Sequence, residues 1–150
     1  MRYKLLGRSG LRVSEVALGT MTFGTEWGWG AAKEECRRMF DAFVEAGGNF
    51  IDTANNYTDG TSERFVGEFV RDDRHRFVVA TKYTLFARRD TPNFGGNHRK
   101  NMVRSLEESL VRLGTDPKVY YISSREWVRK MADHYLPGEF KAFPGPTRLA

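Results

Sequence analysis

Cysteine and long apolar runs are almost missing from this chain. Cys36 is the single cysteine among 150 residues, so a disulfide within the chain is excluded. No apolar run is long enough to cross a membrane, and residues 1–7 lack the apolar segment of a secretory signal peptide. We therefore expect a cytoplasmic protein that has no membrane partner.

The basic residues are not concentrated in one place. The net charge of +5 by itself suits a nucleic-acid partner, but no predicted helix face collects basic residues together with aromatic ones. We interpret these residues as a solvated surface and do not expect nucleic acid as a partner. An anionic cofactor or a general polyanion is the alternative. The basic segments are 37–38, 71–76, 88–89 and 98–100.

The composition is that of a globular protein with one core. Apolar residues make up 40% of the chain and charged residues 29%, which argues against disorder. A β-hairpin is expected at residues 3–13, with its turn at Ser9-Gly10. After it, short apolar segments alternate with amphipathic helical patterns. The expected strands are 16–19, 50–52, 77–81 and 118–123, and the expected helices are 31–46, 62–74, 99–113 and 126–136.

Several of these elements carry an expectation about burial or capping. The segment 16–19 is predicted to be a buried parallel strand, and Ser62 is predicted to be the N-cap of its helix. Gly47 and Gly114 are expected to end two helices. The stripe predicted to be buried consists of Cys36, Met39, Phe40, Phe43 and Val44. On another helix, one side carries Val103, Leu106, Leu110 and Leu113.

Strands that alternate with amphipathic helices predict an α/β fold with parallel strands and the helices outside. Two closures of such a sheet are open: a doubly wound open sheet and a (β/α) barrel. A complete eight-fold barrel needs about 250 residues. The second closure therefore gives a partial barrel, with the hairpin and about the first four βα units.

Three predicted strand ends carry residues typical of a site. Ligands of α/β folds bind at the carboxyl ends of the strands. Here these ends carry the segment 19–21, Asp52 and Lys82, and Tyr57 follows Asp52 closely enough to return to the same edge. Taken singly, each has an ordinary alternative: a turn aspartate, a solvated lysine and a packing tyrosine.

An aspartate, a tyrosine and a lysine at one edge suit the reduction of a carbonyl. A carbonyl that accepts a hydride gains negative charge on its oxygen, and a tyrosine hydroxyl can donate the proton needed there. A nearby lysine cation stabilises the phenolate that remains. A carboxylate paired with the lysine holds the ammonium group in place.

Several motifs resemble those of the aldo-keto reductase family, over residues 3–116. They are YKLLGRSG at 3–10, VALGTMTFG at 16–24, FIDTANNY at 50–57, ATK at 80–82 and RSLEESLVRLGTD at 104–116, while NHRKN at 97–101 resembles the aryl-alcohol-dehydrogenase-like branch. The resemblance implies a (β/α)8 TIM barrel that uses NADPH, with no metal ion, to reduce small-molecule aldehydes and ketones. It implies that the catalytic residues are Asp52, Tyr57 and Lys82, and that the NADP-binding residues are Gly19, Thr20, Met21 and Asp52.

The resemblance ends after Asp116. The family continues into a strand that ends in a histidine, which binds the substrate carbonyl, and its position falls on Ser124. His134, inside a predicted helix, is a poor substitute. We therefore divide the chain into the N-terminal half of an aldo-keto reductase barrel, 1–116, and a divergent tail, 117–150.

Two hypotheses account for the divergent tail. The abrupt loss of resemblance and the Pro/Gly-rich end favour a gene that is truncated or read out of frame after Asp116. The helical spacing of Trp127, Met131 and Tyr135 favours a genuine short protein. The chain is then either an NADPH-dependent reductase or an inactive fragment that binds no cofactor. In both cases the open edges of a partial barrel predict either a weakly stable monomer or self-association.

Overall fold

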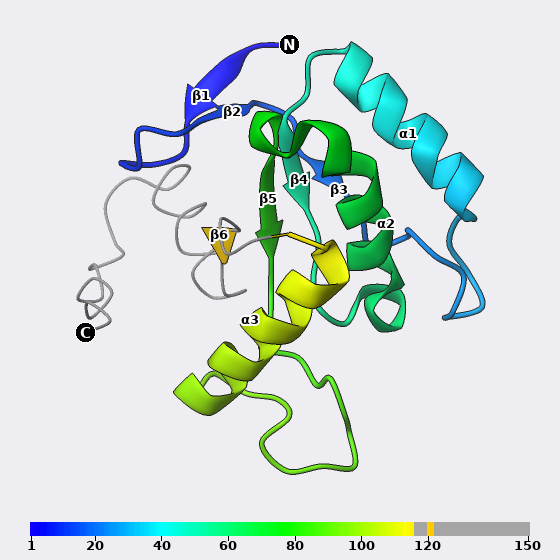
Figure 1. Cartoon of the computed structure of the whole chain (residues 1–150), viewed down its shortest axis with the longest axis vertical. Coiled ribbons are helices and arrows are strands. Elements are labelled where there is room, and N and C mark those ends of the chain that lie inside the picture. Colours follow the sequence, from blue (N-terminus) through cyan, green and yellow to red (C-terminus); the bar gives the residue numbers. More distant parts are fainter. Residues whose placement is uncertain (116–119, 122–150) are drawn as a thin grey trace.

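The computed structural model describes residues 1–115 and the strand at 120–121. They form an α/β structure in which strands and helices alternate along the chain (Figure 1). The strands are β1 Tyr3–Leu5, β2 Arg12–Ser14, β3 Leu18–Gly19, β4 Phe50–Asp52, β5 Val78–Thr81 and β6 Tyr120–Tyr121. The helices are α1 Lys33–Glu45, α2 Thr61–Val70 and α3 Arg99–Leu113, with short 3-10 helices η1 Tyr57–Gly60 and η2 Arg71–Arg76.

The strand pairing confirms the predicted hairpin and the predicted parallel strands. The turn of the hairpin is centred on Gly7-Arg8 and not on Ser9-Gly10, because the Ser9 N–H donates to the Leu6 carbonyl at 3.2 Å. β1 and β2 pair antiparallel, whereas β3, β4, β5 and β6 form a sheet in chain order. Every pair in that sheet is parallel, with Gly19 opposite Asp52 and Asp52 opposite Ala80. The carboxyl ends of these strands therefore meet at one edge of the sheet.

Successive side chains of a strand point to opposite faces of the sheet. The apolar side chains of the strands are therefore divided between two clusters. Ile51 and Val79 belong to the cluster on the helix side, which aromatic rings fill. Phe40 of α1 lies 5.5 Å from Phe69 of α2 and 5.4 Å from Phe77, measured between ring centroids. Burying one such side chain contributes about 2–3 kcal/mol, so these rings hold both helices on the sheet.

The hairpin covers the end of the sheet where the strands begin (Figure 1). Val13 packs with Phe50 and Val78 in the second apolar cluster. Asn49, which precedes β4, accepts a hydrogen bond from the Ser14 backbone through its Oδ1 at 2.7 Å. Because the hairpin occupies the end of the sheet where the strands begin, the end left for ligands is the one that carries the carboxyl ends of the strands.

Helix α1 confirms its predicted stripe. Cys36 and Phe40 are buried, and Met39, Phe43 and Val44 pack against the same cluster. Gly47, with φ of 84°, follows the helix as its stop. Gly114, with φ of 58°, likewise ends α3.

Two further expectations in the first half of the chain are wrong. The segment 16–19 is not a buried strand, because only Leu18–Gly19 pairs and the Val16 side chain is 57% exposed. This strand lies at the edge of the described sheet, with β4 as its one neighbour there. Ser62 is not an N-cap, because α2 begins at Thr61 after Gly60. The Ser62 hydroxyl instead donates to the Thr20 carbonyl at 2.8 Å.

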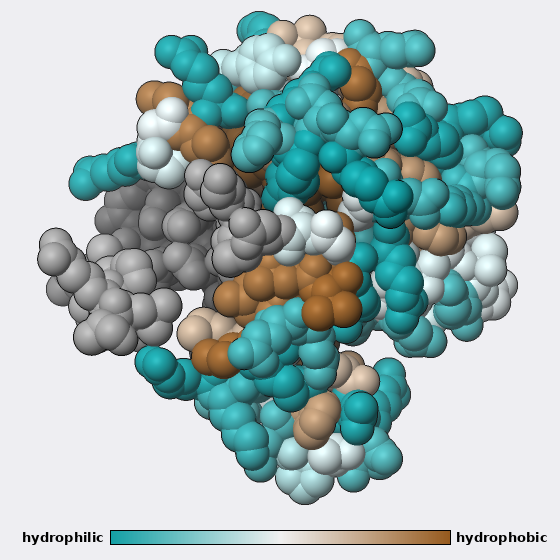
Figure 2. All heavy atoms as spheres, in the orientation of Figure 1, coloured by the Kyte–Doolittle hydropathy of each residue, from teal (hydrophilic) through white to brown (hydrophobic). Residues whose placement is uncertain are grey.

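Of the predicted stripe of α3, Leu113 is buried and Leu106 and Leu110 are half-buried. The buried positions are Asn101, Ser105, Ser109 and Leu113, and Val103 is 40% exposed. Figure 2 shows apolar residues at the surface over α3. A polar face is buried because α2 and α3 approach closely: a Cβ atom at Gly67 would lie 2.3 Å from the Leu113 carbonyl oxygen.

Strand β6 confirms part of the predicted strand 118–123, since Tyr120–Tyr121 pairs with β5. The predicted helix 126–136, Ser124 and His134 lie outside the described residues. Within residues 1–115 and 120–121, no helix is long and apolar enough to cross a membrane.

Candidate active site

Lys82 brings the predicted cluster together at the carboxyl ends of β4 and β5. Its Nζ donates to Asp52 Oδ1 at 2.7 Å and to Asp52 Oδ2 at 2.8 Å. It also donates to the Thr53 carbonyl at 2.9 Å and lies 3.3 Å from the Tyr57 hydroxyl oxygen. Lys82 is therefore in direct contact with both of the other residues predicted as catalytic, Asp52 and Tyr57.

The strand register explains this contact. Asp52 ends β4, and Lys82 directly follows β5, its parallel neighbour. The side chains of Asp52 and Lys82 are 18% and 16% exposed. The ion pair is therefore shielded from most of the solvent but is not fully buried. Charge-assisted bonds of this kind are about twice as strong as neutral ones.

The Tyr57 ring is held from two directions. Lys82 Nζ lies 5.0 Å from the ring centroid, within the range of a cation–π contact. The Trp27 ring meets Tyr57 edge-on, with centroids 6.4 Å apart and an interplanar angle of 85°. In the sequence, the loop with Trp27 and Trp29 fits either one wall of a substrate pocket or simple packing. The contact of Trp27 with Tyr57 was not predicted.

The residues predicted to lie against a cofactor have different environments. Gly19 has open space where a side chain would project, and Met21 is 46% exposed. Thr20 is fully buried, and its hydroxyl donates to the Asp52 carbonyl at 3.1 Å. Thr20 thus fixes the ends of β3 and β4 to each other, whereas the Gly19 backbone is accessible from outside.

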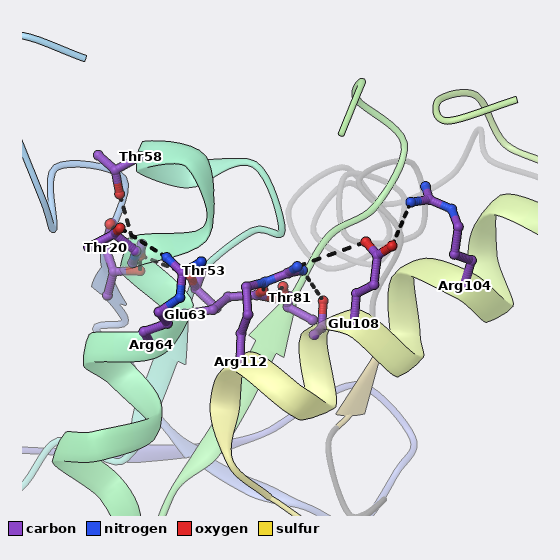
Figure 3. Close-up of polar contacts among 12 residues, drawn as sticks. Thr20, Thr53, Thr58, Glu63, Arg64, Thr81, Arg104, Glu108 and Arg112 are labelled. Carbon is purple, nitrogen blue, oxygen red and sulfur yellow. Dashed lines mark hydrogen bonds and ion pairs between the residues drawn. The ribbon is translucent and has the colours of Figure 1, made fainter. Parts of the chain in front are cut away.

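A buried polar network lies beside these strand ends (Figure 3). Glu63 of α2 is fully buried, and its Oε1 accepts a hydrogen bond from Thr81 Oγ1 at 2.6 Å. Its Oε2 pairs with Arg112 Nε of α3 at 2.6 Å. Nothing in the sequence pattern indicated this pair, because its members are 49 positions apart.

Asn55 lies three residues after Asp52 and is 6% exposed. Its backbone N–H donates to the Lys82 carbonyl at 3.0 Å, which ties the loop after β4 to the end of β5. Its side-chain amide is buried and has no hydrogen-bond partner among the described residues. Among those residues there is also no group of three or more His, Cys, Asp or Glu side chains that would hold a metal ion.

A parallel α/β sheet with polar and charged side chains gathered at its strand ends is typical of α/β enzymes, whose active sites lie at the carboxyl ends of the strands. The chain belongs to the aldo/keto reductase family, whose model matches residues 15–127. The matched range continues past Asp116 and Ser124.

Two relatives show the similarity in detail. The norsolorinic acid reductase stcV of Emericella nidulans is 46% identical over 118 residues, which are 72% of this chain and 30% of that protein. An aryl-alcohol dehydrogenase [NADP(+)] of Phanerodontia chrysosporium is 44% identical over 120 residues, or 71% of this chain and 31% of that protein. The chain therefore spans about three tenths of the length of these relatives.

Among solved structures, the holo form of an aldo-keto reductase from Bacillus halodurans superimposes with a TM-score of 0.70 at 31% sequence identity. The superposition covers 82% of this chain and 40% of that one. The described strands and helices are thus arranged as in part of an aldo-keto reductase.

Proposed function

We propose that this chain carries the proton-donating part of an NADPH-dependent reductase that converts aldehydes or ketones into alcohols. The observation that carries the proposal is the contact of Lys82 Nζ with both Asp52 and the Tyr57 hydroxyl. Within this proposal, the described strands belong to a (β/α)8 barrel. The Tyr57 hydroxyl gives its proton to the carbonyl oxygen of the substrate.

Each member of the cluster has a distinct role in the proposal. When Tyr57 loses its proton, its oxygen becomes an anion 3.3 Å from the Lys82 ammonium group. The cation stabilises that anion. Asp52 holds the ammonium group in place through two short hydrogen bonds, so the cation does not need to reorganise during the reaction.

The residues present fit one end of a nicotinamide cofactor. The accessible backbone at Gly19, the exposed Met21 and the carboxylate of Asp52 lie at the ends of neighbouring strands. Reduced nicotinamide, when bound, supplies the hydride. We propose that this end faces Gly19, Thr20, Met21 and Asp52, with the Thr20 side chain fixing the strand ends rather than touching the cofactor.

A second candidate is a fragment that retains the fold but is inactive and binds no cofactor. It is favoured by the length comparison, since the chain spans only about three tenths of the length of these relatives. It is also favoured by Ser124, which stands where the family resemblance implies the substrate-binding histidine. In either case we propose that the open sheet edges support self-association.

Purified protein mixed with NADPH and an aryl aldehyde separates these candidates. The reductase predicts loss of NADPH absorbance that depends on the protein and disappears in Tyr57→Phe. The fragment predicts neither turnover nor heat of NADPH binding by calorimetry. Binding without turnover would leave the cofactor assignment standing and defeat the claim of catalysis.

A further inference from the structure

The Gly- and Trp-rich segment, residues 24–30, forms a closed loop beside Tyr57. Its ends are joined by hydrogen bonds from Gly24 N to the Ala31 carbonyl at 3.0 Å and from Ala31 N to the Thr22 carbonyl at 2.8 Å. Gly30 has φ of 122°, and a Cβ atom there would lie 2.1 Å from the Gly24 carbonyl oxygen. The loop therefore has a defined shape that only glycine permits at this position.

The loop is fastened to the segment that carries Tyr57. Thr58 Oγ1 donates to the Phe23 carbonyl at 2.5 Å, just before the loop. Thr61 Oγ1 donates to Glu26 Oε1 at 2.5 Å, within it. Trp27 Nε1 lies 3.4 Å from Asp59 Oδ1, a long hydrogen bond. Three contacts from the residues that follow Tyr57 thus fix where the loop lies relative to the phenol ring.

The backbone next to Tyr57 needs such support. Thr58 and Asp59 have φ of 45° and 54°, and residues other than glycine rarely adopt such values. Conformations of this kind persist only where the surroundings impose them, and they gather at functional sites. The Thr58 hydroxyl meets this need by also accepting a hydrogen bond from Ser62 N at 3.1 Å.

We infer that Trp27 is a positioning residue for Tyr57. Its indole contacts the phenol ring edge-on and limits how far the ring can move from Lys82 Nζ. The Trp29 ring lies against Trp27 at an interplanar angle of 49°, with centroids 5.5 Å apart. Trp29 is 51% exposed and makes no ring contact with Tyr57 among the described residues. The consequence for catalysis rests on the proposed reductase function, whereas the placement of the ring does not.

Fluorine NMR on protein labelled with 3-fluorotyrosine tests whether Trp27 positions the Tyr57 ring. The Tyr57 resonance is assigned through Tyr57→Phe. We expect Trp27→Leu, which keeps an apolar side chain but no aromatic edge, to shift and broaden this resonance. Trp27→Phe keeps an edge and should largely restore it. Trp29→Ala removes an indole from the same loop and should leave the resonance where it is.

Kinetics of aldehyde reduction by the same proteins test whether this position of the Tyr57 ring matters for catalysis. Displacing a reacting group by about 1 Å can cost about 100-fold in rate, so we expect Trp27→Leu to lower kcat by about tenfold to 100-fold with KM unchanged. Trp27→Phe should recover most of kcat, and Trp29→Ala should match the parent. A raised KM with unchanged kcat would mean that Trp27 only binds substrate, which overturns the inference.

The two proposals fail in different ways. If the parent protein does not reduce the aldehyde, the proposed function fails while the Tyr57 resonance still decides the role of Trp27. An unmoved resonance in Trp27→Leu overturns the inference. If that variant does not fold, the parent protein decides: absence of a nuclear Overhauser effect between the indole of Trp27 and the Tyr57 ring overturns it.

Discussion

Lys82 connects the other two members of the cluster and compensates a carboxylate that is only 18% exposed. Lys82→Met leaves Asp52 without its cation in a partly buried position. Hydrogen bonds to charged groups contribute about 1.5–3 kcal/mol, so we expect the free energy of unfolding to fall by about 2 kcal/mol. Urea unfolding followed by circular dichroism measures this change.

The matched control is Lys4→Met, since Lys4 is half exposed and pairs with Glu15 at the surface. Exposed pairs contribute about 0–1 kcal/mol, so the control should change little. Adding Asp52→Asn to Lys82→Met should restore part of the loss, because the uncompensated charge is gone. Equal losses in Lys82→Met and Lys4→Met would contradict a buried ion pair.

Among the elements, α2, α3 and β5 are joined by Glu63, Arg112 and Thr81 (Figure 3). Arg112→Met leaves the fully buried carboxylate of Glu63 without its cation. Removing one partner of a buried pair costs about 3–5 kcal/mol, and thermal or urea unfolding should show a loss of this size. The surface variant Arg38→Met, which breaks an exposed contact with Glu35, is the control, and a similarly small effect in both would refute the prediction.

We expect the attachment of the loop 24–30 to α2 to depend on pH. The hydrogen bond from Thr61 lowers the pKa of the Glu26 carboxyl below its ordinary value. A carboxyl with a lower pKa in the folded state contributes stability above its unfolded pKa, about 4, and loses it as the pH falls. We expect Trp27 fluorescence to change as the pH drops below about 4. Glu26→Gln should remove that component, and an identical titration in both proteins would contradict the assignment.

The sequence predicts those features of the fold and the site that follow from patterns within short segments of the chain. Asp52 and Lys82 end neighbouring segments of apolar residues, so their meeting follows from parallel pairing. From the sequence, the polar face of α3 that carries Ser105 and Ser109 would be expected to face the solvent. In the structure this face is buried, because α2 approaches closely at Gly67. Side-chain pairs that join distant segments, such as Trp27 with Tyr57, are set by tertiary packing and have no local pattern.

At the scale of the whole molecule, the described sheet has β3 and β6 as its outer strands. An exposed apolar residue lies next to one of these outer strands: Val16, which precedes β3, is 57% exposed. Unpaired strand edges are templates for pairing with another chain, and a charge placed on them prevents it. We therefore expect a charge placed beside the outer strand β3 to weaken the proposed self-association.

Sedimentation velocity over a range of concentrations tests this expectation. We expect the chain to sediment as a mixture whose dimer fraction rises with concentration, and Val16→Lys to shift that mixture towards monomer by placing a cation beside the β3 edge. Val111→Lys adds the same charge at an 81% exposed valine on α3, and should leave the mixture unchanged. A monomer at every concentration would refute self-association, and equal effects of both variants would show that the strand edge is not the contact.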